Sequence, residues 1–190
     1  MKEQKIIAVI GDANLQENSE KYILAEKLGR SLIDYGFRLI TGGLGGVMEA
    51  ASKGARSSAD HKPGDILGIL PGNDPSEANP YVDIGIPTGL DLARNVIVAN
   101  ADAVIAIGGG AGTLAEIANA WALGRLIIAY RVEGWSGKLA DQKIDSRDRY
   151  PNVPDDRIYG VSSDQEAINC LEFLPLYNKR YKQVKRRDIK

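Results

Sequence analysis

The sequence predicts an α/β protein: a single domain with a Rossmann-like, doubly wound parallel sheet and helices on both faces. Three observations support this prediction. Short and almost continuously apolar segments such as Ala103–Ile107 are typical of strands buried on both faces of a sheet. They alternate with segments whose apolar residues recur at helical spacing, as in βαβ units. A length of 190 residues suffices for one substantial core, and the chain shows neither internal repeats nor an internal domain boundary.

Four strands and two amphipathic helices are predicted in the first half of the chain. Leu24, Leu28 and Leu32 recur on one helix face, and Gly36 is placed to end that helix. Residues 71–81, rich in Pro, Gly, Asn and Asp, predict a loop. The predicted strands are Lys5–Gly11, Phe37–Thr41, Ile66–Leu70 and Val82–Ile86, and the predicted helices are Ser19–Tyr35 and Val47–Ala55.

The second half continues this alternation and ends in a basic tail. A helix carrying Leu92, Val96 and Ala99 is predicted first, and the capping-box sequence at 163–166 predicts the start of a final helix. We expect a folded domain over residues 1–174. The tail, 175–190, holds seven basic residues, which favour a solvated segment or a subunit contact over nucleic-acid binding. The other predicted elements are the strands Ala103–Ile107, Arg125–Tyr130 and Ile158–Val161, and a long polar loop or lid at Gly134–Pro154.

Composition argues against several classes of function. With 24 basic and 25 acidic residues, the net charge of −1 gives no overall attraction to nucleic acid or to an anionic membrane. The single cysteine, Cys170, excludes an internal disulfide and a cysteine-based zinc site, and the single histidine, His61, gives little support to a histidine metal site or a Ser-His-Asp triad. No apolar run approaches the length of a membrane span. We therefore expect a cytoplasmic protein with no membrane partner, no metal and no resident cofactor.

The most informative segment is a run of glycines directly after the strand predicted at Ala103–Ile107. Gly108–Gly112 connects this strand to a helix. Glycines let the backbone approach a phosphate closely, and the first free N–H groups of a helix point at the anion. The alternative is a tight turn without a ligand. The residues predicted to bind phosphate are Gly109, Gly110, Gly112 and Thr113.

A second glycine loop follows the strand predicted at Phe37–Thr41. Ligands of doubly wound folds bind at the carboxyl ends of the strands, where both glycine loops and the end of the first strand are predicted to lie. Neither loop has the G-x-G-x-x-G sequence of dinucleotide enzymes or the Gly-Lys-Ser/Thr of a P-loop. Two separate loops suit one phosphate and one sugar or base. The binding residues predicted here are Gly11, Gly42, Gly43, Gly45 and Gly46.

One acidic residue lies in the first turns of the helix after Gly112. Leu114, Ile117, Ala118 and Trp121 form a single apolar stripe, and Glu116 is expected on the opposite side, facing the mouth of the glycine loop. A carboxylate near a helix N-terminus should stay ionised, which suits the stabilisation of positive charge and argues against a general acid. The alternative is that it only complements the helix dipole.

These residues resemble a known family. The segment Gly108-Gly-Gly-Ala-Gly-Thr-Leu-Ala-Glu116 is similar to the P-G-G-x-G-T-x-x-E motif of the Lonely Guy (LOG) proteins, phosphoribohydrolases once mislabelled as lysine decarboxylases. Gly42–Met48 resembles their second glycine motif, and Arg94 stands at the position of their catalytic arginine. The resemblance covers residues 6–130. It implies a Rossmann-like subunit, an AMP-like nucleotide ligand, Arg94 and Glu116 as catalytic residues, and a homodimer or homotetramer.

Departures from that motif make the chain similar to the molybdenum cofactor carrier-like branch of the same superfamily. Gly108 replaces a proline, Asp91 and Asn95 replace methionine and lysine, and the segment Gly134–Leu139 also fits this branch. Its members bind a phosphorylated pterin. Two functions follow: hydrolysis of a nucleoside 5′-monophosphate to base and ribose 5-phosphate, or non-catalytic carriage of a pterin phosphate. A PLP-dependent decarboxylase lacks support, because no lysine has a recognisable Schiff-base context.

Overall fold

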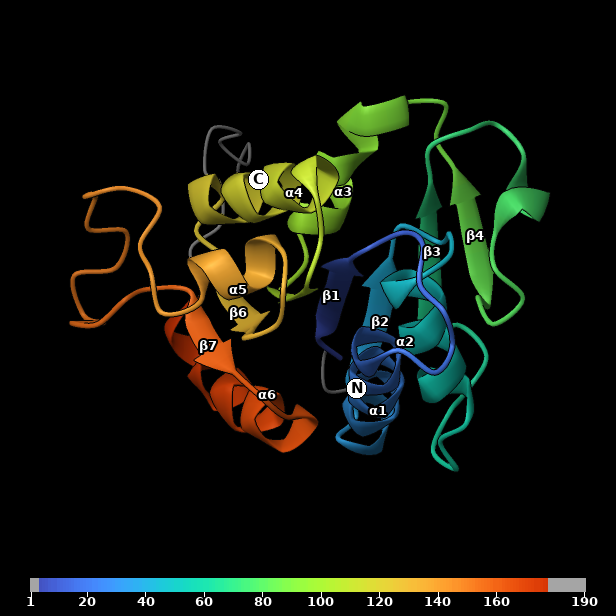
Figure 1. Cartoon of the computed structure of the whole chain (residues 1–190), viewed down its shortest axis with the longest axis horizontal. Coiled ribbons are helices and arrows are strands. Elements are labelled where there is room, and N and C mark those ends of the chain that lie inside the picture. Colours follow the sequence, from blue (N-terminus) through green and yellow to red (C-terminus); the bar gives the residue numbers. More distant parts are fainter. Residues whose placement is uncertain (1–3, 178–190) are drawn as a thin grey trace, which may run out of the picture.

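The computed structural model describes residues 4–177, which contain one seven-stranded sheet with every neighbouring pair of strands parallel. The strand order is β4-β3-β2-β1-β5-β6-β7 (Figure 1). The strands are β1 (Ile6–Gly11), β2 (Arg38–Thr41), β3 (Ile66–Leu70), β4 (Ile84–Pro87), β5 (Ala103–Ile107), β6 (Leu126–Tyr130) and β7 (Tyr159–Val161). The predicted Rossmann-like, doubly wound α/β fold is confirmed.

Helices cover both faces of this sheet (Figure 1). Because side chains alternate along a strand, Ile7 and Val9 of β1 pack with α1, α2 and α6, whereas Ala8 and Ile10 pack with α3 and α4. The helices are α1 (Glu20–Asp34), α2 (Val47–Arg56), α3 (Asn95–Ala99), α4 (Ala111–Ala122), α5 (Trp135–Leu139) and α6 (Asp164–Cys170). Three 3-10 helices complete the described chain: η1 (Pro75–Glu77), η2 (Asp91–Arg94) and η3 (Leu171–Leu176).

The strand order reverses between β1 and β5. After β4 at one edge, the chain returns through η2 and α3 to place β5 beside β1, with Gly11 paired in register with Ile107. A crevice forms at such a reversal, outside the carboxyl ends of the two strands. The register therefore brings the turn after Gly11 next to the glycine loop that follows Ile107.

Two predicted segments differ in detail. The helix expected to carry Leu92 is divided into η2 and α3, and Leu92 is 74% exposed, so it does not join the apolar face of a longer helix. The long polar segment at 134–154 begins with α5. That helix forms because the N–H groups of Trp135 and Ser136 donate to carbonyls of the glycine loop, a tertiary contact that periodicity does not reveal.

The later part of the polar segment is tied to the body of the protein, which argues against a lid. Arg149 and Asp156 form a buried two-pronged ion pair, with Nε–Oδ2 and Nη2–Oδ1 distances of 2.9 and 2.6 Å. The guanidinium of Arg149 lies 3.6 Å from the ring centre of Trp121, and Tyr177 donates to Asp156 at 2.8 Å. The helix η3 and Tyr177 continue the packed structure past residue 174.

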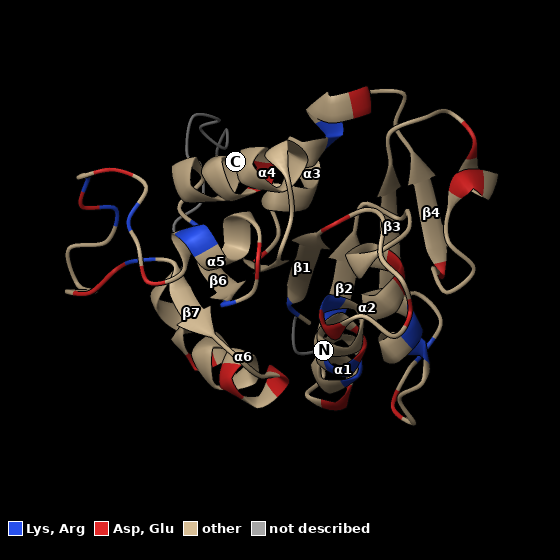
Figure 2. Cartoon of the chain, in the orientation of Figure 1, with Lys and Arg blue, Asp and Glu red and all other residues tan. Residues whose placement is uncertain are grey.

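The basic residues predicted for the tail begin at residue 179 and lie outside the described residues. Figure 2 shows acidic and basic residues interspersed along the ribbon. Within residues 4–177, none of the helices has both the length and the apolar character needed to cross a membrane.

Candidate functional site

A pocket of about 290 Å³ lies at the carboxyl end of β1, between the start of α4 and the segment formed by η2 and α3. Its wall joins segments that are distant in the sequence. Ile10, Leu44 and Met48 supply apolar surface, and Asp12 and Asn95 supply polar groups. Of the predicted site residues, the pocket brings together Gly11, Arg94, Gly110, Gly112, Thr113 and Glu116.

The glycine loop enters α4 through backbone conformations that favour glycine. Gly108 and Gly109 have φ angles of 65° and 94°, in the left-handed region. Gly110 occupies the position before the helix, and Leu114 donates the first helical hydrogen bond back to its carbonyl. The N–H groups at the start of a helix have no partner within it. They therefore present several donors and the positive end of the helix dipole to the pocket.

Hydrogen bonds of Ser136 fix the position of the glycine loop. The Ser136 hydroxyl accepts from the Gly108 N–H at 2.7 Å and donates to the Tyr130 carbonyl at 2.8 Å. The N–H groups of Trp135 and Ser136 donate to the carbonyls of Gly109 and Gly108, both at 3.0 Å. Ser136 is completely buried. The Gly108 N–H therefore already has a partner and is not a free donor for an anion.

Sequence reasoning missed this role of Ser136. The usable signal was Gly134, which lies shortly after the end of β6 at Tyr130 and has a φ of 121°. Any side chain at position 134 would lie within 3 Å of the Gly108 backbone. A glycine shortly after a buried strand can therefore mark the close approach of two loops.

Arg94 and Glu116 meet inside the pocket. Nη1 of Arg94 lies 3.5 Å from Oε1 of Glu116, and the exposed fractions of the two side chains are 12% and 9%. A side chain at position 42 would collide with the guanidinium, so Gly42 provides the surface on which Arg94 rests. Nε of Arg94 is buried and has no hydrogen-bond partner among the described residues.

Glu116 lines the pocket beside Gly110 and Gly112, as expected, but two other expectations were wrong: that it lies away from the packed face of α4, and that it stays ionised. The buried face of α4 contains Thr113, Glu116, Ile117, Ala120 and Trp121, whereas the stripe residue Ala118 is exposed. The reason is that α3 packs against α4, so the packed face of α4 extends beyond the apolar stripe. Burial then raises the pKa of Glu116 from its ordinary 4.5 to about 7, although the nearby Arg94 opposes this shift. Near neutral pH a large fraction of Glu116 is therefore protonated.

None of the four predicted glycines of the second loop, Gly42, Gly43, Gly45 and Gly46, lines the pocket; Leu44 of this loop does. Gly43 lies against the side chain of Leu70, and its N–H donates to the Thr41 hydroxyl at 3.0 Å. Gly45 and Gly46 line a neighbouring cavity of about 420 Å³. Gly46 also allows close packing against the Asp12–Ala13 backbone, where the Val47 N–H donates to the Asp12 carbonyl at 2.9 Å. The main role of these glycines in the structure is thus the close approach of two loops.

Two predicted residues of the first loop pack on each other. The side chain of Thr113 fills the space beside Gly109, so Gly109 lies under the pocket wall and does not line it. The Thr113 hydroxyl donates to the Gly11 carbonyl at 3.2 Å and so joins α4 to the end of β1. Beside Gly108, Lys21 and Asp12 form an ion pair at 2.8 Å, which sequence reasoning did not identify.

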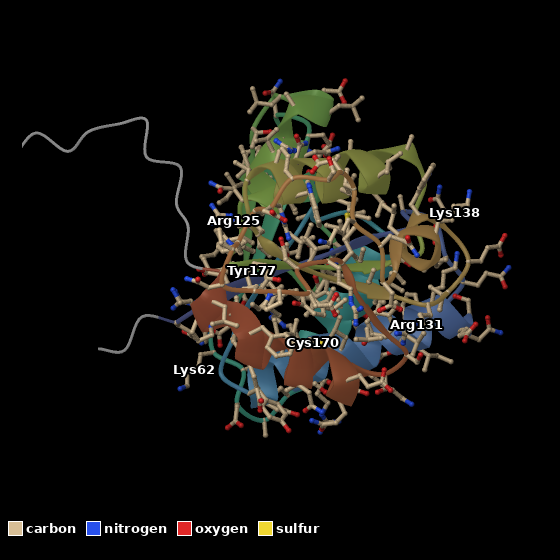
Figure 3. All side chains as sticks on the ribbon, turned by 90° about the vertical axis from the view of Figure 1, so that its left-hand side faces the viewer. Lys62, Arg125, Arg131, Lys138, Cys170 and Tyr177 are labelled. Atoms are coloured by element: carbon tan, nitrogen blue, oxygen red, sulfur yellow. The ribbon has the colours of Figure 1, made fainter. Side chains whose placement is uncertain are left out.

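A separate cavity of about 450 Å³ adjoins Gly134 on the other side. Arg131 and Lys138 line it, and Figure 3 shows both on the same side of the molecule. Arg131 is paired with Asp141 at 2.7 Å, and the Lys138 ammonium lies 4.7 Å from the ring centre of Trp135. The described residues include no group of three or more His, Cys, Asp or Glu side chains that could hold a metal ion.

Comparison with known proteins identifies relatives over most of the chain. Residues 4–158 match the model of the SLOG cluster4 family. A protein of Archaeoglobus fulgidus is 42% identical over 126 residues, which are 66% of this chain and 79% of that protein.

Two solved structures are also similar. The molybdenum cofactor binding protein of the phototrophic bacterium Rippkaea orientalis is 31% identical, with a TM-score of 0.74 and coverage of 92% of this chain and 99% of that one. The molybdenum cofactor carrier protein of Chlamydomonas reinhardtii is 28% identical, with a TM-score of 0.70 and coverage of 90% and 99%. These matches confirm the resemblance to the LOG-like superfamily and to its molybdenum cofactor carrier-like branch. The chain belongs to the SLOG cluster4 family.

Proposed function

We propose that this protein binds a phosphorylated pterin, of which the molybdenum cofactor is the leading example, in the pocket at the carboxyl end of β1. The observation that carries the proposal is the pairing of two anion-binding features in one pocket. Gly110, Gly112 and Thr113 begin α4 at one side, and the guanidinium of Arg94 lies at the other. A phosphate between them is attracted by both the helix N-terminus and a full positive charge.

The rest of the pocket suits a flat heterocycle. Ile10, Leu44 and Met48 provide apolar surface beside the anion site. A methionine side chain packs well against aromatic rings because its thioether is flexible and polarisable. The volume of about 290 Å³ is near the lower end of ligand pockets, which span roughly 300–1,000 Å³. It therefore favours a single ring system with one phosphate over a dinucleotide.

The relatives support the same ligand class. Two similar structures are named as proteins that bind or carry the molybdenum cofactor, and each is covered almost completely by this chain. On this proposal the cofactor is cargo, so the chain itself needs no resident metal or catalytic group. The N–H donors of the glycine loop and Arg94 hold the phosphate, and the buried wall shields the ring from water.

A second candidate function is hydrolysis of a nucleoside 5′-monophosphate, favoured by the position of Glu116. Its carboxyl is buried in the same pocket, beside Arg94. Cleavage breaks the bond between C1′ of ribose and the base nitrogen, and water forms the new C1′–O bond and supplies the proton that the base retains. An ionised Glu116 could stabilise the oxocarbenium-like transition state, and its protonated form could donate to the leaving base.

We also propose that the subunit associates with copies of itself. Leu90, Leu92, Val96 and Ile97 are all at least 43% exposed and lie in the segment that borders the pocket. Exposed apolar residues that are close together mark interaction surfaces. We expect light scattering to give the mass of a dimer or tetramer for the parent. The double variant Leu92→Asp and Val96→Asp should have the mass of a monomer.

Titration calorimetry tests the main proposal with three probes: a pterin phosphate, AMP and inorganic phosphate. We expect heat with the pterin phosphate and weaker binding of inorganic phosphate, because the latter lacks the ring. Absence of binding by all three probes would refute the proposal. Chromatography of the AMP incubation separates the two functions, since release of adenine by the parent but not by Glu116→Gln supports hydrolysis. Binding without adenine release supports a carrier.

A further inference from the structure

Asn95 is a buried amide in the wall of the same pocket. It is the first residue of α3, directly after Arg94, and only 6% of its surface is exposed. It lines the pocket together with Arg94 and Glu116. An amide side chain offers two N–H donors and a carbonyl acceptor, so it is an unusual choice for a buried wall that needs only to exclude water.

The amide of Asn95 makes no hydrogen bond with any described residue. A second buried asparagine provides the contrast, because Asn79 is also 9% exposed or less but is fully engaged. Its Nδ2 donates to the carbonyls of Gly43 and Leu44 at 3.2 and 3.0 Å, and its Oδ1 accepts from the Tyr81 N–H at 3.2 Å. Asn79 therefore has a structural role in holding the second glycine loop. Asn95 has no such partner, and its polar atoms are not among the fully enclosed ones, so the side-chain amide faces the pocket.

The residues around Asn95 indicate which kind of ligand group could form hydrogen bonds with its side chain. Arg94, the preceding residue, already supplies the positive charge needed by an anion, and a neutral amide adds little to that task. Apolar Met48 and Leu92 line the same pocket and suit the faces of a ring. An amide next to apolar surface is suited to the edge of a heterocycle that presents a donor and an acceptor side by side, as a lactam does. Asparagine pairs with such edges through two parallel hydrogen bonds.

We infer that Asn95 is the residue that selects the heterocycle, by hydrogen bonding to an uncharged donor–acceptor edge of the ligand. This inference rests on the proposed function, because it assumes that a phosphorylated ring occupies the pocket. It assigns separate roles to the two parts of the pocket. The start of α4 and Arg94 bind the phosphate, and Asn95 forms hydrogen bonds with the ring. The same edge chemistry occurs in pterins and in purines, so ligands of both kinds belong in the test.

The experiment compares the parent with Asn95→Leu, which keeps the size of the side chain and removes its polar atoms. Affinities are measured for a pterin phosphate, for GMP and for inorganic phosphate. We expect Asn95→Leu to lose at least about tenfold in affinity for the better of the two ring ligands, and to bind inorganic phosphate within about twofold of the parent. Its melting temperature should stay close to that of the parent, because the change removes no hydrogen bond between described residues.

Two further variants make the result specific. Asn119→Leu, on α4 and half-buried, removes an amide that does not line the pocket, and it should leave all three affinities unchanged. Asn95→Ala removes the amide without adding a charge, so it should also weaken ring binding and leave the affinity for inorganic phosphate unchanged; it replaces the leucine variant if that variant fails to fold.

Each outcome bears on a different claim. If the parent binds a ring ligand and the Asn95 variants bind it equally well, the role of Asn95 is overturned and the proposed function stands. If Asn95→Leu loses ring and inorganic phosphate affinity alike, Asn95 shapes the whole site and does not select the ring, which also overturns the inference. If the parent binds none of the three probes, both proposals fail together.

Discussion

Arg94 and Glu116 approach to 3.5 Å within a pocket that largely excludes water from both side chains. This separation exceeds the roughly 2.7–2.9 Å of a strong charge-assisted hydrogen bond. The attraction therefore does not compensate for the burial of the carboxyl, which is why its pKa is raised. The guanidinium remains able to pair with a ligand anion, and Glu116 can take up a proton when that happens.

Glu116→Gln should flatten the pH dependence of stability. The pKa of about 7 in the folded protein lies above the ordinary value of 4.5. The protonated carboxyl is thus favoured by folding, and this contribution is full below pH 4.5 and lost as the pH rises through 7. Between about pH 5 and pH 8 the parent should lose about 2 kcal/mol more free energy of unfolding than the variant. Urea unfolding at both pH values measures this difference, and equal losses in the two proteins would contradict it.

Arg94→Ala should weaken binding of every phosphate-bearing probe. Loss of a charge-assisted contact from a buried site is expected to cost about 1.5–3 kcal/mol of binding free energy. Titration calorimetry with AMP and with a pterin phosphate provides the measurement. Arg131→Ala is the matched control, because Arg131 belongs to the separate cavity and pairs with Asp141. Affinities of Arg94→Ala that equal those of the parent would remove Arg94 from the site.

Ser136→Ala should impair both stability and phosphate binding. The change leaves the Gly108 N–H and the Tyr130 carbonyl without a partner in a buried place. Each unpaired group costs about 1–3 kcal/mol of folding free energy. Release of Gly108 should also loosen the loop that presents the N–H donors, so affinity for inorganic phosphate is expected to fall. Ser162→Ala, an exposed serine close to α6, is the control. A variant as stable as Ser162→Ala would show that the Ser136 hydroxyl does not hold the loop.

Asp156→Asn should destabilise the protein without changing ligand affinity. It breaks the buried pair with Arg149, a change that costs about 3–5 kcal/mol when the remaining charge loses its partner. Neither Arg149 nor Asp156 lines the pocket at β1. Thermal unfolding and calorimetry below the new melting temperature measure the two effects separately. A change in ligand affinity larger than about twofold would indicate that the 143–157 segment acts on the site after all.

The fold and the position of the candidate site at the edge of the sheet are predictable from the sequence. Strands such as Ala103–Ile107 are apolar at every position, which predicts burial on both faces, and helices with one apolar face must cover them. Gly108–Gly112 directly follows such a strand, so its position at the carboxyl edge of the sheet follows from topology alone. The strands, the helices and the position of the glycine loop depend on the spacing of residues along the chain, which the sequence gives directly.

The burial of Glu116, the contacts of Ser136 and the unpaired side chain of Asn95 are visible only in the three-dimensional structure. Periodicity placed Glu116 opposite the apolar stripe, but α3 packs against α4 and Glu116 is buried, which raises its pKa to about 7. The contact of Ser136 with Gly108 joins residues 28 positions apart. Asn79 and Asn95 are both buried, but only Asn79 has hydrogen-bond partners for its side chain among the described residues, and no sequence pattern records this difference. The pKa of a carboxyl and the hydrogen bonds of a serine or asparagine side chain depend on which residues distant in the sequence surround the group. Those neighbours are set by packing in three dimensions.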